Sequence, residues 1–150
     1  MGNIGVLIET DGGSVKETSL GILTAARRQG ENTIIALIME NSIAGAKDIL
    51  GRYGAQTVVH VSAGGADMAA SPDLMAGALA AVVEHYSLDA VFGLASAQGR
   101  DIFARLASRM DLPLASDCLS VDLSAKAIRK SHFSGKTIAT IRVSAAVLIC

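Results

Sequence analysis

Continuous apolar runs alternate with amphipathic segments along residues 4–110 of the chain. The runs are aliphatic and rich in β-branched residues, which is typical of strands covered on both faces. We therefore predict four buried strands, at residues 4–8, 33–38, 57–61 and 89–94. Apolar residues at helical spacing follow each run and predict four helices, which begin near Ser14, Ile43, Pro72 and Gly99 and end near Gly30, Tyr53, Tyr86 and Met110.

Three of the predicted helices start with residues that commonly cap helix N-termini. Ser14 and Glu17 have the Ser-x-x-Glu spacing of a capping box for the first helix. The pair 41–42, Asn-Ser, can cap a short helix over residues 43–53. The segment 71–73, Ser-Pro-Asp, supplies a cap, a proline at the first helical position and an acid in the first turn of the third helix.

The pattern changes beyond Pro113. Residues 118–123 alternate apolar and polar positions and no helix follows them, which indicates antiparallel strands. Residues 127–129 and 138–143 continue this portion and are joined by a turn at 134–136. The chain thus predicts an α/β fold: a mostly parallel sheet with helices on both faces, connected by right-handed crossovers, and a small antiparallel C-terminal extension.

The composition is that of a single domain, residues 1–150, with an aliphatic core. Hydrophobic residues make up 51% of the chain but aromatic residues only 3%. Thirteen Lys and Arg residues against fourteen Asp and Glu residues give a net charge of −1, so no global attraction to nucleic acid or to an anionic membrane is expected. The longest apolar stretch, 143–150, is far shorter than the roughly 20 residues of a membrane helix, and we expect no membrane insertion.

The two cysteines, Cys118 and Cys150, lie far apart in the sequence. They give neither a disulfide framework nor a Cys-x-x-Cys motif of the redox or zinc type. The N-terminus has no basic region followed by a cleavage site. We therefore expect a cytoplasmic protein.

Ligands of parallel α/β sheets bind at the carboxyl ends of the strands, which here lead into loops 9–14, 40–43, 62–71 and 95–101. In the first loop, Gly12 and Gly13 precede a helix and could bind a phosphate through backbone amides, but two acids and the missing motif spacing favour a plain turn. In the last loop, Gly99 and Arg100 could bind an anion at a helix N-terminus. Local or interdomain ion pairs of Arg100 and Asp101 are the favoured interpretation.

No catalytic or metal site can be assigned from the sequence. The histidines, His60, His85 and His132, have no metal-ligand spacing, and no serine lies in a Gly-x-Ser-x-Gly motif. Basic residues gather in the antiparallel region, at 126, 129, 130, 136 and 142. We interpret them as a solvated or partner-facing surface.

Three segments of the chain match one known family in sequence order. The first is the strand that ends in Glu9, its glycine turn and residues 18–27; the second and most specific is 99–109, GRDIFARLASR, with 114–117, LASD. The third, 130–140, KSHFSGKTIAT, is similar to the family segment Arg-Pro-x-Tyr-Ala-Gly-Asn-Ala-x-Ala-Thr. It departs from that pattern at Lys130, Ser131, Phe133 and Lys136. On these segments the chain resembles, from end to end, the N-terminal domain of the electron-transfer flavoprotein α subunit.

The resemblance implies a three-layer, Rossmann-like sheet of the adenine nucleotide α-hydrolase-like type. It also implies a structural and subunit-interface role in a heterodimeric FAD electron carrier, between dehydrogenases such as acyl-CoA dehydrogenases and a quinone reductase or another acceptor. The chain would then be an electron-transfer component and no catalyst by itself. The family holds its flavin mainly in a C-terminal domain of the α subunit, so we expect this chain alone to hold no cofactor. The expected partner is the β subunit, with interface residues Arg100, Asp101, Asp117 and Phe133.

A stand-alone adenine-nucleotide-binding module is the alternative hypothesis. It rests on the relation of this fold to nucleotide-binding α/β domains, among them the family's β subunit with its AMP site. The residues that would form such a site are Gly12, Gly13, Gly99 and Arg100. Whether the chain is a fragment of a longer α subunit or a separate protein stays open at this point.

Overall fold

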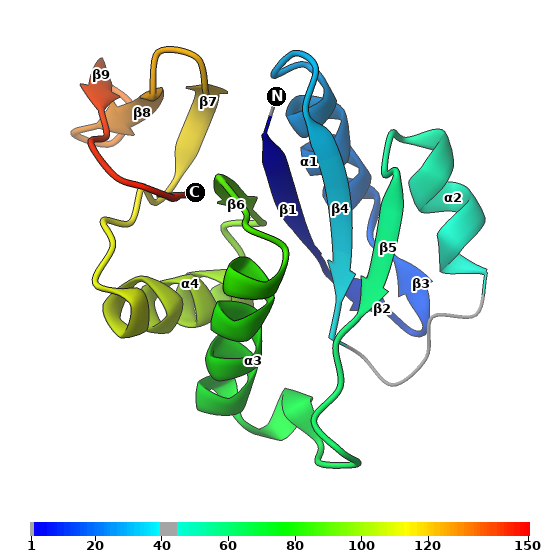
Figure 1. Ribbon diagram of the computed structural model, residues 1–150. Coiled ribbons are helices and arrows are strands. Elements are labelled where there is room, and N and C mark those ends of the chain that lie inside the picture. Colours follow the sequence, from blue (N-terminus) through cyan, green and yellow to red (C-terminus); the bar gives the residue numbers. More distant parts are fainter. Residues whose placement is uncertain (1, 40–44) are drawn as a thin grey trace.

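The computed structural model describes residues 2–39 and 45–150 (Figure 1). Its main sheet has the strand order β10-β6-β1-β4-β5, and every neighbouring pair is parallel. The strands are β1 (Asn3–Ile8), β4 (Thr33–Ile38), β5 (Thr57–His60), β6 (Ala90–Phe92) and β10 (Leu148–Ile149). The expected α/β architecture is therefore confirmed.

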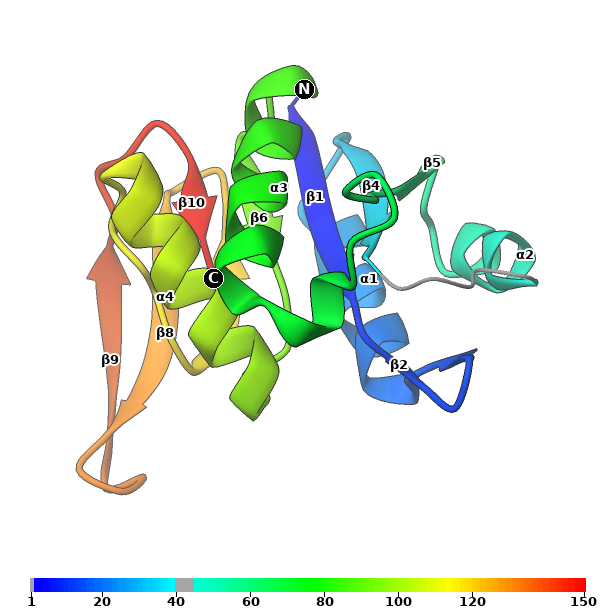
Figure 2. The ribbon, with the colours of Figure 1, turned by 90° about the horizontal axis from the view of Figure 1, so that it is seen from below.

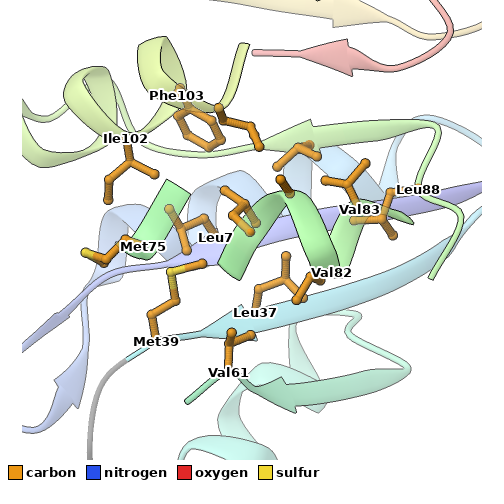
Figure 3. Close-up of a cluster of buried hydrophobic side chains, with 14 of the residues drawn as sticks. Leu7, Leu37, Met39, Val61, Met75, Val82, Val83, Leu88, Ile102 and Phe103 are labelled. Atoms are coloured by element: carbon orange, nitrogen blue, oxygen red, sulfur yellow. The ribbon is translucent and has the colours of Figure 1, made fainter. Parts of the chain in front are cut away.

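Helices cover both faces of this sheet (Figures 1 and 2). They are α1 (Glu17–Arg27), α2 (Ala46–Arg52), α3 (Pro72–His85) and α4 (Ala97–Met110), with a 3-10 turn, η1, at Met68–Ala70. Side chains of α1 and α2 share one buried cluster with Val6 and Ala36, whereas α3 and α4 share the other with Leu7 and Leu37. Figure 3 shows the second cluster, in which Leu7 and Leu37 lie among side chains of α3 and α4. Successive residues of β1 and β4 thus serve opposite faces, which explains why these strands are apolar throughout.

The predicted capping box at Ser14 is wrong. Gly12 and Gly13 both have positive φ and form the turn of a small hairpin between β2 (Thr10–Asp11) and β3 (Ser14–Val15). Two consecutive residues with positive φ are the signature of the tight hairpin turns that glycine favours. Ser14 is thereby used in the hairpin, and α1 begins only at Glu17, after Lys16 and without a side-chain cap.

The starts of α3 and α4 agree more closely with the sequence pattern, whereas α2 begins at Ala46, three residues after the predicted start. Ser71 caps α3 by accepting a hydrogen bond from the Leu74 N–H at 3.3 Å, with Pro72 at the first helical position. The cap predicted at 41–42 lies outside the described residues. Helix α4 begins two residues before the predicted Gly99, because Ser96 caps it by accepting from the Gly99 N–H at 2.9 Å.

The C-terminal extension is the predicted antiparallel sheet, made of β7 (Cys118–Asp122), β8 (Ala127–His132) and β9 (Thr137–Arg142). We call it the three-stranded sheet. Ile128 of β8 is 2% exposed and belongs to the cluster under α1, so this sheet is anchored on the main body. After it the chain returns to the main sheet as β10, a fifth parallel strand that the sequence pattern did not predict. No helix in the described part of the chain is long and apolar enough to cross a membrane.

Asp122 stabilises the turn between β7 and β8 and gives a prediction about pH. Its carboxylate accepts hydrogen bonds from Ser124 Oγ at 2.6 Å and from the Ala125 N–H at 3.0 Å. These bonds, the Ser124 hydroxyl first, lower the pKa of Asp122 below its ordinary value. Because the folded-state pKa is depressed, the stabilisation is present above the unfolded-state pKa and is lost as pH falls through the folded-state value. We expect Ser124→Ala to raise this pKa when carboxyl chemical shifts are followed by NMR. An identical titration curve in both proteins would contradict this role.

Candidate functional site

The crevice where doubly wound folds bind ligands lies between β1 and β6 in this sheet. From β1 the chain crosses to β4 on one side, whereas β6 lies on the other side of β1. The loops that leave the carboxyl ends of β1 and β6 therefore diverge and leave a crevice between them. Residues 9–16 and 93–96 form these two loops.

A buried carboxylate joins the two loops. Glu9, only 5% exposed, accepts a hydrogen bond from the Ser96 hydroxyl through Oε1 and forms an ion pair with Lys16 Nζ at 2.7 Å through Oε2. Its own N–H donates to Ser19 Oγ at 3.0 Å, so both its backbone and its side chain are held. Ser96 in turn caps α4. Glu9 thus connects the ends of β1, α1 and α4 at the position where a ligand would bind.

This arrangement bears on the anion site expected at the same edge. A phosphate at this crevice would meet the buried Glu9 carboxylate and would have to compete with it for the charge of Lys16. Gly12 and Gly13 lie in an open turn, where a Cβ atom would meet nothing within 4 Å, and this is the plain turn favoured from the sequence. Gly99 lies in the first turn of α4, where a Cβ atom would be 2.0 Å from the Leu94 carbonyl oxygen. Its local role is therefore close backbone packing.

A cleft of about 370 Å³ lies beside this crevice. Its walls come from α1, from the loop after β6, from α4 and from the segment 114–121 that leads into β7, with Cys150 also in the lining. Arg100 lines the cleft and forms an ion pair with Asp117, at 2.6 Å between Nη2 and Oδ1. Both side chains are more than half exposed, so we expect this pair to contribute little to stability.

The four expected interface residues fall into three places. Arg100 and Asp117 pair with each other, as the local ion-pair interpretation requires. Asp101 pairs instead with Arg105 at 2.8 Å, one helical turn along α4, and Arg105 also reaches Asp73 of α3 at 2.6 Å. Phe133 lies in the turn between β8 and β9 and is 79% exposed. Of the four residues, the structure therefore brings only Arg100 and Asp117 into contact.

Large apolar side chains are exposed mainly on the three-stranded sheet. Of the six in the described residues, four belong to this sheet or its turn, namely Leu119, Phe133, Ile138 and Ile141. We call these four residues the apolar patch; they lie on both faces of the sheet, because Ile138 and Ile141 are three positions apart on β9 and Ile141 is paired with the buried Ile128. β9 is the last strand of the sheet and pairs only with β8 among the described strands. Exposed apolar side chains around an open strand edge are typical of a protein interface.

No metal centre is found among the described residues. No group of three or more His, Cys, Asp or Glu side chains within that part of the chain could hold an ion. The three histidines lie on different elements, at the end of β5, at the end of α3 and at the end of β8.

Sequence reasoning missed two features of this region. Glu9 and Ser96 are 87 positions apart, so only the strand order brings them together. Cys118 and Cys150 line one cleft although nothing in their spacing suggests a pair. Ser96, three positions before the predicted start of the fourth helix at Gly99, was the one local signal available, since serine is a common cap residue.

Comparison with known proteins identifies the family. The model of the electron transfer flavoprotein domain matches residues 4–150. A probable mitochondrial electron transfer flavoprotein subunit alpha of Cryptococcus neoformans var. grubii is 25% identical over 142 residues, which cover 93% of this chain and 40% of that protein. An electron transfer flavoprotein subunit alpha of Syntrophomonas wolfei is 24% identical over 143 residues, covering 93% of this chain and 44% of the relative.

The chain thus spans less than half the length of these curated relatives. The region they share with it is the N-terminal part of the α subunit, as the resemblance of residues 99–117 and 130–140 implied. The match to the family model covers almost the whole chain, and the parallel sheet with its antiparallel extension agrees with the fold expected for it. The chain therefore belongs to the electron transfer flavoprotein domain family, and within it is similar to α subunits.

Proposed function

We propose that this chain is the scaffold and subunit-interface domain of an electron transfer flavoprotein α subunit, and that it docks a β subunit. The observation that carries the proposal is the apolar patch, because it concentrates exposed Leu119, Phe133, Ile138 and Ile141 on one small sheet. The family match over residues 4–150 supplies the class of partner. The electron carrier would be the assembled protein, which passes electrons between dehydrogenases and an acceptor.

The described residues at this edge of the sheet do not suit FAD. The diphosphate of FAD is anionic, whereas the crevice between β1 and β6 contains the buried Glu9 carboxylate, which already forms an ion pair with Lys16. In the neighbouring cleft, the guanidinium of Arg100 is already paired with Asp117. We therefore assign no step of electron transfer to this chain and expect flavin binding to depend on other parts of the assembled protein.

The apolar patch gives a direct test of the proposed interface. Ile138 is 54% exposed on β9, so Ile138→Lys should leave the fold intact while it places a charge in a surface that must be desolvated. We expect this variant to weaken binding to a cognate β subunit by about tenfold or more, measured by calorimetry or by size-exclusion chromatography. The matched control is Ala81→Lys, which adds the same charge at an exposed position of α3.

Two results would overturn the proposal. Equal β-subunit affinity of the Ile138→Lys and Ala81→Lys proteins would remove the patch from the interface. Stoichiometric binding of FAD by the purified chain alone, seen as a flavin absorption spectrum after titration and gel filtration, would show that the chain is a cofactor domain in its own right. Unchanged circular dichroism of both variants ensures that a loss of binding reports on the surface.

A further inference from the structure

The two cysteines of the chain lie together at one cleft. Cys118 is the first residue of β7, and Cys150 follows β10. Both line the cleft of about 370 Å³ between α1, α4 and the segment 114–121, and both are partly exposed. Each thiol shifts the pKa of the other: Cys150 lowers that of Cys118, and Cys118 raises that of Cys150. The pair is therefore open to a small solute and close enough for one thiol to affect the other.

Backbone hydrogen bonds hold both cysteines in place. Cys150 donates its N–H to the Val91 carbonyl at 2.9 Å and accepts from the Gly93 N–H at 3.0 Å. On the other side, the Ala115 N–H donates to the Ile149 carbonyl at 2.9 Å, and the Cys118 thiol donates to the Ala115 carbonyl oxygen at 3.1 Å. The segment that carries Cys118 is thus fastened directly to the segment that carries Cys150.

We propose that Cys118 and Cys150 are a modification site, at which a hydroperoxide converts the two thiols to a reversible intramolecular disulfide. This inference concerns the cleft and does not depend on the proposed docking of a β subunit. The substrate class is a small hydroperoxide such as hydrogen peroxide, which can enter an open cleft of this size. The bond would connect the first strand of the three-stranded sheet to the edge of the main sheet.

The chemistry assigns different roles to the two sulfurs. The hydrogen bond with Cys150 lowers the pKa of Cys118 most, the positive charge of Lys130 lowers it further, and burial and Asp117 act in the opposite direction. The same hydrogen bond and burial raise the pKa of Cys150. Lys130 is the register partner of Cys118 on β8, so its charge is fixed nearby by strand pairing. Cys118 is therefore the attacking thiolate and Cys150 the resolving thiol.

The two steps balance without any further reagent. The Cys118 thiolate attacks one peroxide oxygen, the O–O bond breaks, and the hydroxide that leaves takes the released proton as water, which gives a sulfenic acid. The Cys150 sulfur then attacks the sulfenic sulfur, the S–S bond forms as the S–O bond breaks, and its proton leaves with the hydroxyl as a second water. Two thiols lose two electrons in total, and the peroxide gains them. A low-molecular-weight thiol reverses the reaction by exchange.

Peptide mapping of the oxidised chain tests the proposal. The purified protein is treated with one equivalent of hydrogen peroxide, digested under non-reducing conditions and analysed by mass spectrometry. We expect a cross-linked peptide pair that contains residues 118 and 150, the loss of both free thiols, and full recovery of the thiols after addition of dithiothreitol. Recovery of only sulfinic acid, of disulfide-linked dimers or of unreacted thiols would overturn it.

Single variants test the order of the steps. Cys150→Ser should accumulate a sulfenic acid at Cys118 that dimedone traps, whereas Cys118→Ser should react with peroxide more slowly by about tenfold or more. Two charge variants change the rate of the peroxide reaction, which would stay the same if the cysteines had only a structural role. Lys130→Met should slow the peroxide reaction of Cys118 severalfold, and Asp117→Asn should accelerate it. Faster oxidation of Cys150 than of Cys118 in the two single-cysteine proteins would contradict the assigned roles.

Discussion

Replacing Gly99 with alanine should lower the free energy of unfolding by about 3 kcal/mol, because the added methyl group has no room. A Cβ atom at this position would lie 2.0 Å from the Leu94 carbonyl oxygen and 3.2 Å from its carbonyl carbon. These are backbone atoms, so no side-chain rotation relieves the clash and the first turn of α4 must move. For a chain of this size the melting temperature should fall by about 6–12 °C.

The control for this substitution is Gly21→Ala. Gly21 also lies in a helix, α1, but it is exposed and a Cβ atom there would meet nothing within 4 Å. Alanine stabilises such a helix position by up to about 1 kcal/mol relative to glycine. Chemical denaturation of the two variants and the parent protein gives the comparison. Equal denaturation midpoints for Gly99→Ala and Gly21→Ala would show that disturbing the close approach of α4 to Leu94 does not lower the free energy of unfolding.

Ser96→Ala is expected to cost about 2–4 kcal/mol, more than the loss of an ordinary helix cap. Removal of a serine cap costs about 1 kcal/mol. Here the same hydroxyl also donates to the carboxylate of Glu9, which is 5% exposed, and a buried charged group that loses a donor adds a further penalty of about 1–3 kcal/mol. Urea denaturation measures the total.

Ser71→Ala provides the matched control, because Ser71 caps a helix of the same length, α3, by the same type of hydrogen bond. We expect a loss of about 1 kcal/mol there. In a Glu9→Gln background the cost of Ser96→Ala should fall toward that value, since a neutral amide is cheaper to leave without a donor than a carboxylate. Equal losses in the free energy of unfolding for Ser96→Ala and Ser71→Ala would contradict the proposed link between β1 and α4.

The parts of the fold that local patterns specify were predictable from the sequence. β1 and β4 are buried on both faces, and their continuous apolar runs indicate this without reference to any other segment. The start of α3 was equally clear, because Ser71 and Pro72 act within one helical turn. The hairpin at residues 10–15 was missed because Ser14 also fits a capping box, and only the conformation of Gly12 and Gly13 decides between the two.

The remaining features depend on contacts between distant segments. β10 has only two residues, and its place beside β6 follows from tertiary packing and from no pattern of its own. The connection between Glu9 and Ser96 likewise needs the strand order, because each residue alone resembles an ordinary loop position. The sequence therefore predicted the edge of the sheet that carries the candidate site, whereas the carboxylate that occupies this edge became evident only from the structure.

The short strand β10 has a consequence for local unfolding. It is held to its neighbours by a few backbone hydrogen bonds, from Leu148 to Asp89, from Cys150 to Val91 and from Gly93 to Cys150, with one more from Ala115 to Ile149 on its outer side. A two-residue edge strand of this kind can detach at a lower free energy than the central strands β1 and β4. When it does, the fully buried strand β6 becomes an unprotected sheet edge, and such an edge can pair with another chain. Retention of residues 148–150 on the sheet thus protects the chain against edge-to-edge aggregation.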